Sequence, residues 1–169
     1  MVSLMKGFAG KPPHAPLTDI GIGAYTAGVA MLVAGAAGFE ERAMATASVL
    51  AIAVGLIAAV PTIITGLVDL FRIPATSPAR TLGWWHLTVM ASATGMFAGT
   101  FRVQLAGYND GKIISLALTL GVISWVLLVA GGYLGGALTF VYGVRVLKNP
   151  QATISDALIP GRAKEASSD

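Results

Sequence analysis

The stretch from Ala43 to Leu70, AMATASVLAIAVGLIAAVPTIITGLVDL, decides the fold class of this chain. It carries no charged side chain before Asp69. It is also longer than the roughly 20 apolar residues that an α-helix needs to cross a bilayer core of about 30 Å. Pro61 removes one backbone donor and is expected to bend the helix. The stretch therefore predicts a transmembrane helix.

The composition of the whole chain supports a membrane protein. Of its 169 residues, 55% are hydrophobic and 11% are charged, which is too apolar for an ordinary soluble domain. The formal net charge of +3 comes from basic residues that flank apolar segments, so it gives no reason to expect a nucleic-acid partner. Cysteine is absent, which excludes disulfides, thiolate-bound metals, cysteine-ligated iron-sulfur clusters and covalently attached c-type haem.

Three further apolar segments accompany this stretch. A short polar turn at 40–42 precedes it, a proline-containing loop at 72–83 follows it, and a glycine-flanked turn at 107–111 comes before the last segment. The sequence therefore predicts an all-α fold, an integral membrane four-helix bundle within residues 17–147. Its spans are expected at about 17–39, 43–70, 84–106 and 113–146.

The two ends of the chain are predicted to lie outside the bundle. Residues 1–16 form an interfacial lead-in, because three prolines oppose a helix that runs from there into the membrane. Residues 148–169 are polar and form a cytoplasmic tail. The last span, 113–146, is longer than a bilayer requires, so its paired glycines between 131 and 136 are expected to tilt, kink or end the helix.

The distribution of basic residues predicts the orientation. The side of the bundle that holds both termini and the second loop has eight Lys and Arg residues: Lys6, Lys11, Arg72, Arg80, Arg145, Lys148, Arg162 and Lys164. The opposite side has three: Arg42, Arg102 and Lys112. Because cytoplasmic loops are enriched in Lys and Arg, both termini are expected in the cytoplasm, and the protein is expected in the bacterial inner membrane as a multi-pass protein.

Four residues that could carry chemistry fall at this predicted cytoplasmic end. They are His14, Asp19, Asp69 and His86. His86 follows Trp84 and Trp85, which are typical of a membrane–water boundary, and it enters a segment expected to lie in hydrocarbon. Ionisable residues in such segments are rare and usually functional, so these four are the candidate site.

The third span has two helix faces of different character. One face carries His86, Met90, Ala93 and Phe97. The other, about 140° around the helix, carries Ala91, Gly95 and Gly99. Small residues at four-residue spacing let helices approach closely, so the second face is predicted to be the closest-packed one. The histidine is accordingly expected to lie away from it.

The two aspartates differ in their electrostatic setting. Asp19 lies in the first turn of its predicted helix, where the helix dipole favours a negative charge, so a capping role explains it. Asp69 lies in the last turn, where the dipole opposes a carboxylate. A cationic partner is therefore expected for Asp69. Arg72, three residues on, is the simplest partner, and His86 and Arg80 are the alternatives.

Several motifs resemble one bacterial family of membrane proteins. Residues 131–146, GGYLGGALTFVYGVRV, resemble its closing signature, G-x-L-G-G-x-L-x-Y-x-x-G-V-x-V. Residues 14–23 are similar to its N-terminal motif H-P-x-L-x-D-x-P-I-G, and residues 65–69 to its T-G-x-x-D. His86 matches the histidine that opens the family's third helix. The family is known as domain of unknown function 2231, and the likeness covers about residues 14–147.

This resemblance implies a four-helix membrane fold without an established activity. The chain departs from the family pattern at Ala15 and Gly21, which replace prolines, and at Phe140, which replaces the closing tyrosine. Some members of the family carry a Rieske iron-sulfur domain after this region, which associates the bundle with electron transfer. This chain has neither the length nor the cysteines for that domain.

Three hypotheses are open for the four ionisable residues. In the first, the protein is a membrane scaffold or accessory subunit without catalytic activity, bound to a membrane partner or to a second copy. The four residues then form a hydrogen-bond network that sets helix register. In the second, His14 and His86 are axial ligands of haem b or hold a metal ion, and Asp19 and Asp69 orient the imidazoles. In the third, Asp19, Asp69 and His86 relay protons in a small carrier.

Overall fold

The computed structural model describes residues 13–146 and 153–155. Its helices are α1 (His14–Ala36), α2 (Glu41–Arg72), α3 (Pro78–Tyr108) and α4 (Ser115–Phe140). No strand occurs in the part of the chain that the structure describes. The prediction of an all-α fold with four helices is therefore confirmed.

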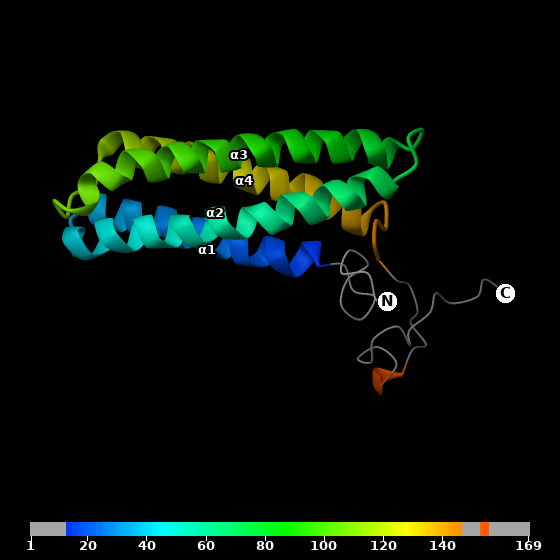
Figure 1. The fold of residues 1–169 in the computed structure, drawn as a ribbon, viewed down its shortest axis with the longest axis horizontal. Coiled ribbons are helices and arrows are strands. Elements are labelled where there is room, and N and C mark those ends of the chain that lie inside the picture. The colour runs from blue at the N-terminus through cyan, green and yellow to red at the C-terminus, as the bar shows by residue number, and fades with distance from the viewer. Residues whose placement is uncertain (1–12, 147–152, 156–169) are drawn as a thin grey trace.

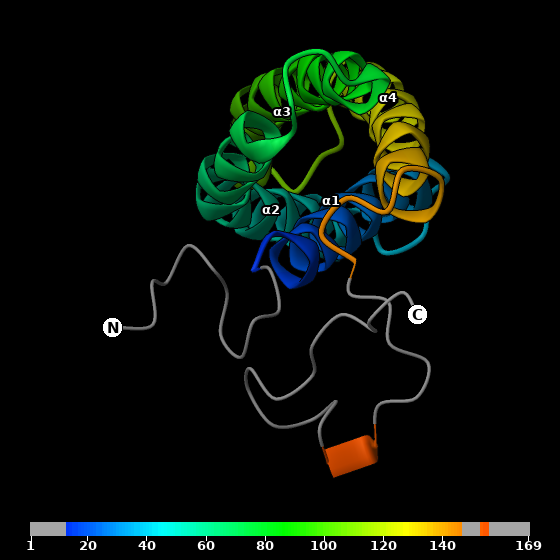
Figure 2. The same cartoon turned by 90° about the vertical axis from the view of Figure 1, so that its right-hand side faces the viewer.

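The helices form two antiparallel hairpins that lie side by side in an elongated bundle (Figure 1). α1 packs mainly against α2, and α3 packs mainly against α4. Fewer contacts, between α2 and α3 and between α1 and α4, close the ring that Figure 2 shows from one end. We call the end of the bundle that faces the viewer in Figure 2 the His14 end. α1 and α3 begin there, and α2 and α4 end there (Figure 1). The topology thus gathers the three helix ends that carry the candidate residues, together with the end of α4.

Three of the described helices are long and apolar enough to cross a membrane. They are α1, α2 and α4. α3 has 31 residues and is not among them. Large apolar side chains such as Ile57, Phe71 and Val126 are exposed on the outside of the bundle, as expected for surfaces that face lipid.

Two helices begin earlier than the sequence predicts. α1 begins at His14 and not at 17, so this histidine belongs to the helix and not to a lead-in. Pro16 is tolerated because it lies in the first turn, where a backbone donor has no helical partner to lose. α3 begins at Pro78 and not at 84, after Ser77, whose hydroxyl accepts a hydrogen bond from the Ala79 amide at 3.2 Å. His86 therefore lies in the third turn of a regular helix.

The glycines of the fourth helix do not end it, which was one of the outcomes expected for 113–146. α4 runs through all of them and ends at Phe140. Gly131 and Gly135 instead make room for side chains of α3, because a Cβ atom at either position would contact Met90 or His86. Residues 141–146 follow as a non-helical segment in which Gly143 and Arg145 have positive φ angles of 64° and 61°.

The core lies where an aromatic pair joins the two hairpins. The rings of Tyr25 and Phe97 stack with centroids 4.0 Å apart and an interplanar angle of 2°. Leu32, Ile52 and Ala93, all fully buried, surround the pair. The core is therefore formed by the face of α3 that also carries His86.

The face of α3 that was predicted to be the closest-packed one does not make the closest helix approaches. Gly95 has open space where a side chain would be, so the face with Ala91 and Gly99 is not the closest-packed one. A Cβ atom at Gly28 would lie 2.6 Å from the Ile52 side chain, and one at Gly55 would lie 2.5 Å from the Tyr25 ring. Glycine is therefore required at the seam between α1 and α2 as well as at the one between α3 and α4.

Replacing Gly55 with alanine tests this packing. Gly55→Ala is expected to lower the free energy of unfolding by about 1–3 kcal/mol, because the new methyl group meets a ring that Phe97 holds in place. The effect is measured as thermal loss of helical circular dichroism in detergent. Gly95→Ala is the matched control and is expected to gain up to about 1 kcal/mol from helix propensity. A Gly55→Ala variant as stable as Gly95→Ala would contradict the packing.

Candidate functional site

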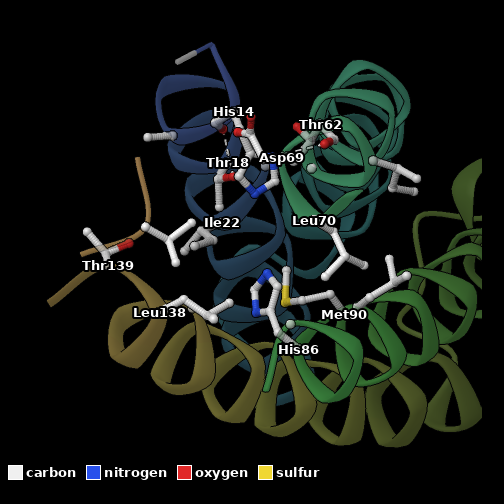
Figure 3. A pocket seen from close by; sticks show the side chains of 18 of the residues that line it. His14, Thr18, Ile22, Thr62, Asp69, Leu70, His86, Met90, Leu138 and Thr139 are labelled. Carbon is white, nitrogen blue, oxygen red and sulfur yellow. Dashed lines mark hydrogen bonds between the residues drawn. The ribbon is translucent and has the colours of Figure 1, made fainter. Parts of the chain in front are cut away.

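A cavity of about 220 Å³ opens inside the bundle at the His14 end. All four helices and residues 144–146 line it, and most of the lining side chains are apolar. The residues that matter for its chemistry are His14, Tyr25, Asp69, His86 and Arg145. Figure 3 shows several of them from close by. Three of the four residues predicted from the sequence therefore meet at one cavity.

His14 is fixed by the helix that pairs with its own. Its Nδ1 atom lies 3.0 Å from the carbonyl oxygen of Thr62 and 3.4 Å from the Thr65 hydroxyl oxygen. Because a carbonyl oxygen can only accept, Nδ1 must carry the proton and donate it. The other ring nitrogen, Nε2, then holds a lone pair in the neutral imidazole.

His86 is held in the same way by α4. Its Nδ1 atom lies 2.8 Å from the carbonyl oxygen of Gly131, so this nitrogen is again the donor. Nε2 again keeps its lone pair. Figure 3 shows the two imidazole rings approaching each other from opposite sides of the cavity, His14 from α1 and His86 from α3.

A glycine makes each of these hydrogen bonds possible. Gly66 lies four residues after Thr62, and Gly135 lies four residues after Gly131. A Cβ atom would lie 2.7 Å from Cε1 of His14 at Gly66, and 2.9 Å from Cε1 of His86 at Gly135. Without a Cβ atom there, the ring can reach a helical carbonyl oxygen, which accepts a hydrogen bond from outside its own helix. The two hairpins thus repeat one arrangement of histidine, carbonyl and glycine.

Asp69 pairs with a residue that the sequence did not indicate. Its Oδ1 atom lies 3.0 Å from Nε of Arg145 and 3.9 Å from Nη1 of Arg72. Arg72 is therefore the more distant partner. Arg80 instead donates to the carbonyl of Ile73 at 2.7 Å. His86, the other alternative, bonds to α4.

Asp19 stands apart from the other three candidates. It is exposed on α1 and does not line the cavity. Neither aspartate accepts a hydrogen bond from an imidazole, because backbone carbonyls occupy both Nδ1 atoms. The prediction that Asp19 and Asp69 orient the histidines is therefore replaced by orientation through the backbone.

Tyr25 is a cavity residue that sequence reasoning missed. Its side chain is only 3% exposed, and its hydroxyl has no hydrogen-bond partner among the described residues. Thr94 is a polar neighbour, but no bond of normal geometry joins the two. Tyr25 lies 11 residues, or roughly 16 Å, further along α1 than His14. It therefore marks the inner part of the cavity, where the lining carries no charge.

These features define an all-helical membrane protein whose two hairpins enclose a cavity with a histidine on each side. The chain belongs to the family described as "Predicted membrane protein (DUF2231)", whose model matches residues 10–148. The family predicted from the motifs is thereby confirmed. No curated protein and no solved structure matches the chain. Within 13–146 and 153–155, no group of three or more His, Cys, Asp or Glu residues could hold a metal ion.

A double-mutant cycle tests the ion pair between Asp69 and Arg145. Asp69→Asn and Arg145→Gln are expected to show a coupling energy of about 1 kcal/mol, because the carboxylate is largely shielded from water and the contact is short. Unfolding in a graded series of denaturing detergent measures it. Asp19→Asn, combined with the same arginine variant, serves as the control and should show no coupling. Equal behaviour of the two aspartates would argue against the pair.

Proposed function

We propose that this protein binds haem b in the cavity, with His14 and His86 as its two axial ligands, and that it transfers single electrons within the membrane. The observation that carries the proposal is the repeated histidine arrangement. Each ring gives its Nδ1 proton to a backbone carbonyl, which leaves Nε2 as a ligand atom. The two rings come from opposite hairpins and approach the same cavity (Figure 3).

The donor set suits a haem. A porphyrin supplies four equatorial nitrogens, so its iron needs only two ligands from the protein, one on each face. The hydrogen bonds from Nδ1 to a carbonyl fix the ring orientation and raise the basicity of Nε2. When bound, haem supplies one-electron redox chemistry. The residues of this chain hold it, orient it and exclude water from it.

The cavity walls also suit the apolar body of a porphyrin. Ile22, Leu87 and Leu128 are among the apolar side chains that line it. Its volume of about 220 Å³ is below the roughly 300–1,000 Å³ typical of ligand pockets. Binding therefore requires the cavity to widen, and residues 144–146 are the part of the lining that follows α4 and is not held in a helix.

This proposal explains the geometry better than a purely structural network does. Such a network was expected to join the two histidines to Asp19 and Asp69. In the structure each histidine instead bonds to the backbone of the next helix, and Asp19 lies outside the cavity. A proton relay through Asp19 lacks support for the same reason. The scaffold hypothesis therefore becomes the alternative outcome of the test.

Absorption spectroscopy tests haem binding directly. Protein expressed with haem supply, or titrated with haem b in detergent, should show a Soret band and the low-spin spectrum of two imidazole ligands. His14→Ala and His86→Ala should each abolish the low-spin form. Met90→Leu is the matched control, because Met90 lines the same cavity one helical turn beyond His86 and carries no imidazole. A folded wild type that stays colourless in haem would support the scaffold.

The proposal includes a location and an orientation. We place the His14 end on the cytoplasmic side of the bacterial inner membrane, on the basis of eight Lys and Arg residues against three. Electrons would then be exchanged near the cytoplasmic surface with a membrane electron carrier, either a partner protein or a second copy of this chain.

The absence of cysteine makes this orientation testable. Thr76→Cys lies in the loop at the His14 end, and Asn109→Cys lies in the turn at the opposite end; both positions are exposed. A membrane-impermeant thiol reagent should label Asn109→Cys in intact spheroplasts and label Thr76→Cys only after the membrane is opened. The reverse pattern would place the His14 end on the outer face. The cysteine-free wild type is the blank.

A further inference from the structure

Arg145 is the one Lys or Arg residue that lines the cavity in the part of the chain that the structure describes. It lies at the mouth, on the segment that follows α4, and its backbone has the left-handed φ of 61° that non-glycine residues rarely adopt. The side chain is 30% exposed, so it lies between the cavity and its surroundings. A strained backbone that carries a functional side chain is common at ligand-binding sites.

The ion pair with Asp69 leaves part of the guanidinium group available. Within the described residues, Arg145 makes this one ion pair, and the contact uses Nε. The two terminal nitrogens of the planar group can bind a second carboxylate end-on, through two parallel hydrogen bonds. Arg72 lies 3.9 Å from the same carboxylate. The mouth therefore has two positive charges around one negative charge.

The two ends of the cavity differ in charge. The outer end has Asp69 and Arg145, whereas the inner end has uncharged groups such as Tyr25, Thr94 and Leu128. A negative charge is costly inside a membrane bundle unless a cation accompanies it. An anionic group on the ligand is therefore best accommodated at the mouth.

We propose that Arg145 binds the carboxylate groups of the cavity's ligand and thereby fixes which edge of the ligand faces outward. This inference rests on the proposed function, since haem b carries two propionate carboxylates on one edge. In the free protein, Asp69 keeps Arg145 over the cavity. When the ligand is bound, the terminal nitrogens of Arg145 donate charge-assisted hydrogen bonds to its carboxylate. These bonds keep the opposite, apolar edge of the ligand directed toward Tyr25.

Comparing haem b with its iron-porphyrin dimethyl ester tests the proposal. The ester keeps the iron and the axial positions but lacks the two negative charges. The wild type should bind haem b about tenfold or more tightly than the ester, as charge-assisted hydrogen bonds imply. Arg145→Gln should bind both with equal affinity. Affinity is measured by titration followed at the Soret band in detergent.

Two further variants separate recognition from structure. Asp69→Asn breaks the same ion pair but keeps the cation, so it should retain the preference for haem b over the ester. Arg102→Gln removes an exposed arginine at the opposite end of α3 and should leave the preference unchanged. Helical circular dichroism confirms that each variant is folded.

The outcomes distinguish this inference from the proposed function. If the wild type binds neither porphyrin through its histidines, both fail. If it binds both porphyrins equally with two imidazole ligands, the haem proposal stands and the role of Arg145 is overturned. Loss of the preference in Asp69→Asn as well as in Arg145→Gln would also overturn it, because the effect would then come from the broken ion pair.

Discussion

The structure depends on one constraint: a polar atom inside a bundle surrounded by lipid must find its partner within the protein. An imidazole is a demanding case, because its N–H group needs an acceptor and the helical carbonyls nearby already accept hydrogen bonds within their own helices. This chain meets the need at Gly66 and Gly135, where the missing side chain exposes a carbonyl to a second donor. Bringing each ring within 3.0 Å of that carbonyl requires α1 to lie close to α2, and α3 close to α4, at the His14 end.

Much of the fold could be predicted because membrane helices are recognisable in a sequence as long runs of apolar residues. The uncharged run from Ala43, the polar turns and the family motifs together gave four helices, and all four are present. Helix ends were less predictable. α1 and α3 each begin several residues before the apolar run, since the first turns of a helix tolerate proline and polar residues. α4 ended earlier than its hydrophobicity suggested, because an apolar segment need not remain helical.

The site could be predicted only in part, because residue type does not reveal how a helix is rotated against its neighbours. Gly55 and Gly95 look alike in the sequence, yet one contacts an aromatic ring and the other faces open space. His86 was found because an ionisable residue in an apolar segment is conspicuous. His14 lay outside the predicted spans and was found because it opens the family's N-terminal motif. Tyr25 was overlooked because a tyrosine there suggests ordinary packing. Arg145 was used only in the count of basic residues that predicts the orientation. Its ion pair with Asp69 was missed, because the two residues are more than seventy positions apart in the sequence.

The repetition of the histidine arrangement in the two hairpins has a consequence for biogenesis. Each hairpin completes the hydrogen bond of its own histidine, so each can reach its local geometry as soon as its second helix is inserted. Neither hairpin encloses the cavity alone, since its walls come from all four helices. The two imidazoles therefore face one cavity only after the two hairpins have docked. A cofactor that needs both rings would bind only the assembled protein. Its binding would then stabilise the assembled state over the separate hairpins.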